Sequence, residues 1–338
     1  PDRLFPVEPL LRDIARALFD TVEKLPIISP HGHCDPRWFA ENRRFPNPAE
    51  LLVIPDHYLV RMLVSQGVTH AQLGIPRHDG GACETDARAV WRLFASHYHL
   101  FRGTPSAMWL DHSFEHLFGI DSILSADTAD SYYDHIDGCL GRDGFRPRAL
   151  FEQFNVEVLA TTDAATDELA WHSQLLDSGW DGNVITTYRP DATIDPEFEG
   201  FAANLARLGE LTGEDTSSWT GYLAAHRARR AFFKSFGATA TDHGHPSSRT
   251  ANLPPAEAET LFSRIITGSG STEDADLFRG QMLTEMARMS LDDGLVMQIH
   301  PGSRRNHSPD VLSRHGRDMG FDIPGRTDYV DCLLYTSP

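Results

Sequence analysis

The chain has 338 residues, 41% of them hydrophobic, and its 48 acidic and 30 basic side chains give a formal net charge of -18. This size and composition suffice for one large globular domain or two smaller ones. The negative charge repels nucleic acid and anionic membrane surfaces, so neither is expected as a partner, and an anionic substrate would have to meet a local group of arginines.

The sequence also bears on the cellular compartment. It contains no apolar run long enough to cross a membrane and does not begin with the layout of a signal peptide, which predicts a cytoplasmic protein. The cysteines, Cys34, Cys83, Cys139 and Cys332, are far apart and form no Cys-x-x-Cys pair. We therefore expect reduced thiols, with Cys34 as a small buried residue.

The first expected elements are a helix and a strand. Apolar residues with helical spacing between Val7 and Val22 predict an amphipathic helix that covers one end of the core, and Pro26 ends it. The apolar run that follows ends in His31-Gly-His33. In a strand, residues i and i+2 point to the same face, so these imidazoles would form half of a divalent-metal site. The alternative is a chance pair of surface histidines, against which the position at the end of a first α/β strand argues.

The rest of the chain divides into a helical part and a part in which strands and helices alternate. Residues 36–150 carry aromatic-rich helical stretches broken by Pro and Gly, which predicts a helical insertion between the first and second strands. From residue 151 onwards, strands are expected at 156–163, 183–189, 238–243 and 294–300, with helices between them. The predicted units are the N-terminal helix with the first strand (1–35), a helical subdomain (36–150), the further barrel strands with their helices (151–331), and a non-native or truncated tail (332–338).

Buried parallel strands that alternate with helices favour an α/β fold of the (β/α)8 TIM-barrel type, of which about the first five strands are present. Each expected strand ends in residues able to do chemistry, and the carboxyl ends of barrel strands form the active face. One polar residue at a strand end means little, because loops are polar, but five successive strands argue for a site. The residues are His31 and His33, Asp163, Arg189, Asp242 with His243, and His300.

Several short stretches, taken in their order and spacing, resemble uronate isomerase (glucuronate isomerase), a family of the amidohydrolase superfamily. The resemblance extends from about Leu4 to Tyr329 and implies a TIM barrel of the metal-dependent hydrolase kind. The stretches are His31-Gly-His33, Asp56-His-Tyr58, Arg102-Gly-Thr-Pro-Ser with Trp109, Thr161-Thr-Asp163, Tyr188-Arg-Pro-Asp191, Phe232-Phe233 with Asp242-His-Gly244, and Met297-Gln-Ile-His-Pro-Gly-Ser-Arg-Arg-Asn306.

The resemblance implies an enzyme that converts D-glucuronate to D-fructuronate, D-galacturonate to D-tagaturonate, or both, by moving a proton between C2 and C1. It places Tyr58, Arg189 and His300 in the active site as catalytic residues. His31 and His33 would hold a divalent metal, for which Zn²⁺ is favoured. The partner would be a small-molecule hexuronate, and a homo-oligomer is compatible with the sequence.

Elementary chemistry gives each residue a role and a plainer alternative. Tyr58 can carry a proton to or from a sugar oxygen, or it is a packing residue with its hydroxyl in water. Arg189 can stabilise an enediolate or bind the substrate carboxylate, or it pairs with Asp191. His300 can hydrogen-bond a substrate oxygen. Arg305 is a second carboxylate-binding candidate, or it is solvated.

The end of the fourth strand bears on an alternative function. Asp242 and His243 are candidates for orienting the metal ligands, or Asp242 caps a helix. The alternative function is a metal-dependent hydrolase of the same superfamily, in which the cation activates water. Against it, the sequence offers no suitable Lys ligand at this strand end.

Two features depart from the family pattern. Asp163 is followed by Ala164-Ala165, where the family often continues with Asp-Pro. Family members also run past this length, with three further strands, the last of which carries an Asp that completes the metal site. Because five strands cannot close an eight-stranded barrel without open edges, we expect an inactive fragment.

Overall fold

The computed structural model describes residues 2, 4–330 and 332. Of the expected tail 332–338, Cys332 is described and buried, and 333–338 lie outside the described residues. The four cysteines are free thiols, as predicted, and Cys34 packs half-buried beside a small apolar cluster. None of the described helices combines the length and the apolar character needed to cross a membrane.

The strands β1 to β7 run parallel, and neighbouring strands follow one another along the chain. β1 pairs with β2 and β2 with β4, while β3 pairs with β5, β5 with β6 and β6 with β7. β3 and β5 continue the lines of β2 and β4 after short interruptions. The strands are β1 (Ile27–Ser29), β2 (Val156–Ala160), β3 (Asp163–Ala164), β4 (Asn183–Ile185), β5 (Tyr188–Arg189), β6 (Ala240–His243), β7 (Val296–Ile299), β8 (Ser303–Arg304) and β9 (Ile323–Pro324).

This parallel order with intervening helices is a TIM-barrel-like α/β fold. The five expected strands are found, but two of them are divided, and β8 and β9 form an additional antiparallel pair that the sequence did not predict. The departure at Asp163-Ala-Ala165 does not end the sheet, because Ala165 N–H still donates to the carbonyl of Arg189 at 2.9 Å.

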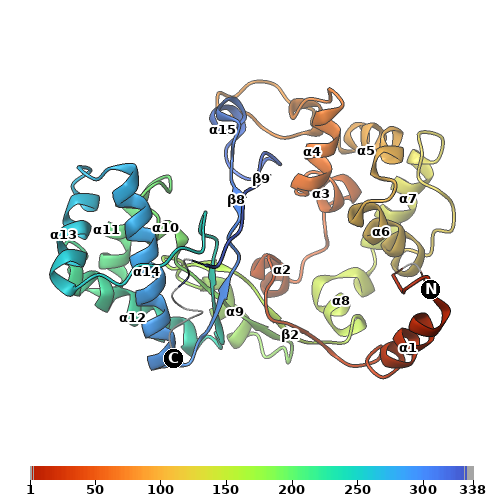
Figure 1. Ribbon diagram of the computed structural model, residues 1–338. Helices are drawn as coiled ribbons and strands as arrows, with labels where there is room; N and C mark the ends of the chain where they lie inside the picture. The colour runs from red at the N-terminus through yellow and green to blue at the C-terminus, as the bar shows by residue number, and fades with distance from the viewer. Residues whose placement is uncertain (1, 3, 331, 333–338) are drawn as a thin grey trace.

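Between β1 and β2 the described chain is helical, as the sequence predicts, and Figure 1 shows this part to one side of the strands. It comprises α2 (Pro36–Glu41), α3 (Pro48–Leu52), α4 (His57–Ser65), α5 (Ala87–Ser96), α6 (Pro105–His112), α7 (Ala129–Leu140) and α8 (Pro147–Gln153), with the short turns η1 (Ala71–Leu73), η2 (Tyr98–Phe101), η3 (Ser113–Leu117) and η4 (Asp143–Phe145).

The helices after β2 alternate with the strands. α11 to α14 gather at the left of Figure 1, on the opposite side of the strands from α3 to α7. These helices are α9 (Ala170–Asp177), α10 (Asp191–Ile194), α11 (Phe201–Thr212), α12 (Trp219–Ser235), α13 (Pro255–Ile266), α14 (Thr272–Asp293) and α15 (Pro309–His315).

Local signals in the sequence fix several helix ends. The Asp56 carboxylate accepts the backbone N–H groups of Tyr58 and Leu59 and so begins α4. α12 is followed by Gly237 at φ +87°, the left-handed conformation in which glycine commonly follows a helix. Ser271 and Asp274 form a capping box that starts α14.

Two apolar cores hold the two parts of the chain. The helices between β1 and β2 bury their own cluster, which includes Leu63, Trp91 and Phe94. A second cluster lies among the strands and α11 to α14, and it contains Phe233 and Met282. Each fully buried side chain of this size contributes roughly 1.5–3 kcal/mol by leaving water.

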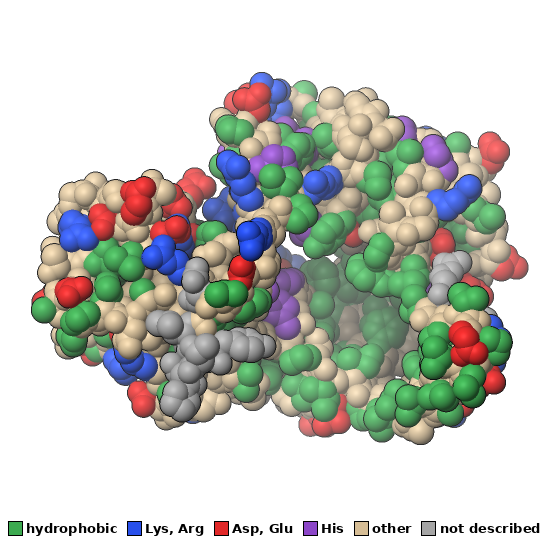
Figure 2. All heavy atoms as spheres, viewed as in Figure 1, with side chains coloured by type: hydrophobic (Ala, Val, Ile, Leu, Met, Phe, Trp, Pro, Cys, Tyr) green, Lys and Arg blue, Asp and Glu red, His purple; other side chains and the backbone are tan. Residues whose placement is uncertain are grey.

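The N-terminal helix departs from its prediction. α1 (Pro9–Asp20) forms where apolar periodicity indicates a helix, but it buries none of its residues and does not cover the core. Leu10 is 66% exposed and Ile14 is 50% exposed. Figure 1 places α1 at the lower right, and Figure 2 shows hydrophobic side chains on the surface there. Periodicity therefore identified the helix and its apolar face, but not what that face contacts.

Candidate active site

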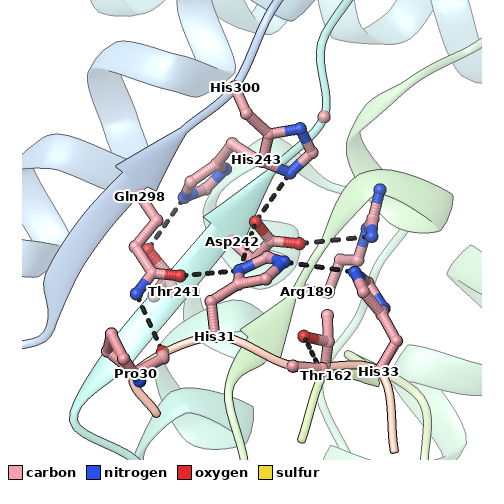
Figure 3. A network of polar contacts seen from close by, with 12 residues as sticks. Pro30, His31, His33, Thr162, Arg189, Thr241, Asp242, His243, Gln298 and His300 are labelled. Atoms are coloured by element: carbon pink, nitrogen blue, oxygen red, sulfur yellow. Dashed lines mark hydrogen bonds and ion pairs between the residues drawn. The ribbon is translucent and has the colours of Figure 1, made fainter. Parts of the chain in front are cut away.

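Side chains at the carboxyl ends of β1, of β4 with its continuation β5, of β6 and of β7 converge at one place (Figure 3). His31 and His33 follow β1, and Arg189 ends the β4 and β5 line. Asp242 lies in β6, and His300 comes directly after β7. The prediction that these strand ends meet is confirmed for these five residues by the contacts described below.

The two imidazoles of the first loop face each other. β1 ends at Ser29, so His31 and His33 lie in the loop rather than in the strand, but their Nε2 atoms are only 3.1 Å apart. Gly32 between them allows the chain to pass close to the next strand, since a Cβ there would lie 2.9 Å from the carbonyl oxygen of Ala160.

Gln298 on β7 orients His31. The His31 Nδ1–H donates to the Gln298 Oε1 at 3.0 Å, and the Gln298 amide donates to the carbonyl of Pro30 at 3.0 Å. In this tautomer the His31 Nε2 carries a lone pair toward His33. The residues fit a divalent cation, because two nitrogens that bind one ion at roughly 2.0–2.1 Å must lie within about 4 Å of each other.

His31, His33, Arg189, Asp242 and His300 form a polar cluster, in which Asp242 is the fully buried anion. His300 Nε2 lies 2.7 Å from its Oδ1, Arg189 Nη1 lies 3.2 Å from its Oδ2, and His31 Nδ1 lies 3.5 Å from its Oδ1. Burial raises the pKa of Asp242, but the contact with His300 and the charge of Arg189 outweigh it, so the net pKa lies below its ordinary value. Asp242 is therefore charged at neutral pH and caps no helix.

Arg189 is held by two carboxylates. Its Nε donates to Asp191 Oδ2 at 2.9 Å while its other end reaches Asp242. The pairing with Asp191 that the sequence suggested as an alternative is thus present, but it orients Arg189 toward the cluster instead of toward solvent. Gly244 makes room for this, because a Cβ there would lie 2.7 Å from Arg189 Nη2 and 2.9 Å from Asp191 Oδ2.

A cavity of about 1270 Å³ opens beside the cluster. Figure 2 shows a hollow in the middle of the molecule with histidine at its wall. His31, His33, Arg189 and His300 line the cavity, and Arg304, Arg305 and Arg317 add positive charge to it. Arg305 also lies 3.5 Å from Asp322. The arginines of the cavity wall thus form the local group that an anionic substrate requires on an acidic protein.

Three other predicted residues lie elsewhere. Tyr58 is 64% exposed, and its ring is tilted by 43° relative to that of His57. Of these two residues, His57 lines the cavity. Asp163 accepts the hydroxyl groups of Thr161 and Thr186 at 2.6 Å and does not line the cavity. His243 is fully buried, where its Nε2 is 2.9 Å from the Thr241 hydroxyl, and burial lowers its pKa well below the ordinary value.

Sequence reasoning missed several residues of the site. Gln298 stands two residues before His300, so strand spacing could have placed it beside the cluster. His245 completes a second His-x-His sequence with His243, the same signal that identified the first pair. The sequence offers Asp191 as a partner of Arg189 but does not indicate that this pairing orients Arg189 within the site.

Comparison with known proteins agrees with the resemblance seen in the sequence. The sequence pattern of the family described as glucuronate isomerase matches residues 9–335. The uronate isomerase of Mesorhizobium japonicum is 62% identical over 333 residues, which is 98% of this chain and 71% of that protein. The uronate isomerase of Rhizobium meliloti is 59% identical, with the same coverage of both chains.

Solved structures agree with the fold. The crystal structure of glucuronate isomerase from Caulobacter crescentus has a TM-score of 0.95 at 55% identity and covers 98% of this chain and 69% of that chain. The uronate isomerase from Thermotoga maritima has a TM-score of 0.88 at 24% identity, covers 99% and 71% of the two chains, and supports the fold alone.

These matches cover nearly the whole chain, and they give no support to the expectation of an inactive fragment with only the first strands of a barrel. Because the family pattern spans residues 9–335 and relatives of more than 55% identity align with 98% of the sequence, the chain belongs to the glucuronate isomerase family.

Proposed function

We propose that this protein interconverts a hexuronate and its ketose, D-glucuronate with D-fructuronate, D-galacturonate with D-tagaturonate, or both. The observation that carries the proposal is the meeting of two imidazoles, an arginine, a buried carboxylate and a further histidine at one cavity lined by arginines. Membership of the glucuronate isomerase family supports the same reaction.

The reaction defines what the site has to supply. A proton moves from C2 to C1 through an enediol-like intermediate, so a group must take and return a proton and positive charge must stabilise the developing oxyanion. The substrate carboxylate in addition requires a guanidinium, whose planar fork matches it. No water is consumed, which separates isomerisation from hydrolysis.

Two arginines meet these requirements for charge. Arg189 has contacts on both sides, with Asp191 and Asp242, which hold its guanidinium at the cavity wall. A guanidinium held in this way is already oriented for an enediolate oxygen and needs little reorganisation. Arg305, farther along the same cavity, is assigned the substrate carboxylate.

His31 and His33 are assigned a divalent cation, with Zn²⁺ favoured by their nitrogen donors. When bound, the cation orients the carbonyl and hydroxyl oxygens of the sugar and polarises them. Burial, followed by the charges of His31 and Arg189, lowers the pKa of His33, which keeps its imidazole in the neutral form that binds metal.

We assign to His300 the transfer of a proton to or from a substrate oxygen. Its Nε2 lies 2.7 Å from Oδ1 of the buried Asp242, and this contact fixes the orientation of the ring. The imidazole itself remains partly exposed at the cavity, where a sugar hydroxyl can reach it. Tyr58 can act as a proton carrier only if its exposed side chain turns toward the cavity when substrate binds. Its neighbour His57 already lines the cavity.

The test is an assay of the full chain with D-glucuronate and D-galacturonate, supplied with Zn²⁺ and followed by product analysis. The proposal predicts a ketouronate of the same mass as the substrate. A parallel panel of esters and amides addresses the alternative of a metal-dependent hydrolase. Hydrolysis of the panel without uronate conversion would refute the proposal.

A further inference from the structure

A second His-Gly-His sequence, His243-Gly-His245, lies at the end of β6, next to the cluster but apart from His31 and His33. We propose that His243, His245 and Asp191 form a second binding site, for a divalent transition-metal ion. This inference goes beyond the proposed isomerisation, which assigns a cation only to His31 and His33.

The donor atoms are already close together. One oxygen of Asp191 and one ring nitrogen from each of His243 and His245 lie within 4.8 Å of one another. Two imidazoles and one carboxylate are a common ligand set for zinc and for other first-row divalent ions. An ion bound by all three would hold each of these atoms at roughly 2.0–2.2 Å.

The second observation is the lack of partners for these imidazoles. Both His243 and His245 are buried, and the Nδ1 of His243 and both ring nitrogens of His245 have no hydrogen-bond partner among the described residues. A buried polar group without a partner costs roughly 1–3 kcal/mol. Two neighbouring histidines in this condition need a common explanation, and an ion that accepts a lone pair from each provides one.

The buried imidazoles are in the right protonation state to bind an ion. Burial lowers the pKa of His243 and of His245, so both are neutral and each has a lone pair to give. Asp191 supplies negative charge, although Arg189 and the backbone N–H of Gly244 already share its oxygens. The nearby guanidinium opposes a cation, so we expect weaker binding here than at His31 and His33.

The site is reached from the cavity. Asp191, Gly244 and His245 line its wall, while His243 lies deeper, behind them. Neither His31 nor His33 belongs to this group of donor atoms. Asp191 would then belong both to this site and to the contact that orients Arg189, which links metal occupancy to the position of that guanidinium.

The experiment measures bound Zn²⁺ per chain by mass spectrometry of the metal, after excess ion is removed by gel filtration and without substrate. We expect two equivalents in the unaltered protein and one in the variant with His31→Asn and His33→Asn. In that double variant, adding His245→Gln should weaken Zn²⁺ binding by more than the roughly 10–100-fold that loss of an outer partner of a metal ligand costs.

Controls keep the result interpretable. His226→Gln removes a different fully buried histidine, one that contacts the Tyr188 hydroxyl, and should leave the Zn²⁺ content unchanged. If the His245 variant does not fold, Asp191→Asn in the same background takes its place, with the same expected loss. Absence of bound Zn²⁺ in the His31 and His33 double variant overturns the proposal, and so does an unchanged affinity after replacement of His245 or Asp191.

Failure of this inference and failure of the proposed function are distinguishable. A protein that converts uronate but holds a single Zn²⁺, lost with His31 and His33, retains the function and lacks the second site. A protein that holds two ions and converts no uronate has the second site and lacks the function.

Discussion

The Nε2 of His300 lies 2.7 Å from the carboxylate of Asp242, which is completely buried at the end of the neighbouring strand. Asp242 also contacts Arg189 and His31. One buried charge therefore connects three residues with assigned roles: His300 in proton transfer, Arg189 in stabilising the oxyanion, and His31 in binding the cation. A buried carboxylate is stable only with such partners, and their loss would leave an unpaired charge.

Replacement of Asp242 by Asn therefore tests the centre of the cluster. The change keeps the shape and removes the charge that orients His300 and Arg189. We expect kcat for uronate conversion to fall at least about 100-fold, comparable to the loss of one preorganised group in other active sites. Steady-state kinetics measure this, with Asp310→Asn, an exposed carboxylate on α15, as the matched control. A kcat within a few-fold of that of the unaltered protein would contradict the assignment.

Replacement of Arg305 by Ala tests recognition of the substrate carboxylate. If Arg305 binds this group, KM for uronate rises by about tenfold or more, because a charged hydrogen bond is worth roughly 1.5–3 kcal/mol. The exposed Arg326, which pairs with Asp328, provides the control, and its replacement by Ala should leave KM unchanged. An equal KM in the Arg305 variant would assign the carboxylate to another residue.

Much of the fold follows from the sequence because its signals are local. Apolar runs identified the parallel strands, and helical periodicity identified helices such as α1. The convergence of His31, Asp242 and His300 also followed, since the carboxyl ends of parallel strands share one face.

Other features depend on contacts between distant residues and could not be read from the sequence. β8 and β9 have two residues each, which is too short for a period-2 pattern to identify them. Which residue of the pair His57 and Tyr58 faces the cavity depends on how α4 is rotated, which the N-cap at Asp56 does not decide. The exposure of α1 likewise depends on what lies beside it.

The buried pair of His226 and Tyr188 predicts a dependence of stability on pH. The Tyr188 hydroxyl donates to His226 Nδ1 at 2.7 Å, and burial lowers the pKa of His226 to about 3 from 6.5. Below pH 6.5, His226 binds a proton in the unfolded chain but stays neutral in the folded chain. The stability from this group is thus complete above pH 6.5 and is lost as the pH falls toward 3.

Between pH 7.5 and 5.5 this group alone should lower the free energy of unfolding by about 1.4 kcal/mol. Urea unfolding at both pH values measures the change. His226→Gln should reduce the difference between the two pH values by that amount, whereas His99→Gln, at an exposed position, should leave it unaltered. The same difference in the His226 variant as in the unaltered protein would contradict the prediction.

The exposed helix α1 predicts an unusual tolerance to polar substitution. Because Leu10 is 66% exposed, Ile14 is 50% exposed and α1 has no buried residue, replacing both with Ser should change the free energy of unfolding by less than about 0.5 kcal/mol. By contrast, Leu63→Ala, at a fully buried position in the helical part, should lower it by about 2–5 kcal/mol. Denaturant unfolding of the variants provides the comparison. A loss above 2 kcal/mol in the α1 variant would mean that its apolar face is covered.

The central claim is that the cluster around Asp242 moves a proton between C2 and C1 of a hexuronate. Its most direct test is to incubate the Zn²⁺-supplied protein with D-glucuronate carrying deuterium at C2 and to follow the label by NMR. The account predicts a ketouronate in which the deuterium has left C2, for C1 or for solvent, and loss of this conversion in the His33→Asn variant. Unchanged glucuronate that keeps its deuterium at C2, with the unaltered protein folded and loaded with Zn²⁺, would contradict it.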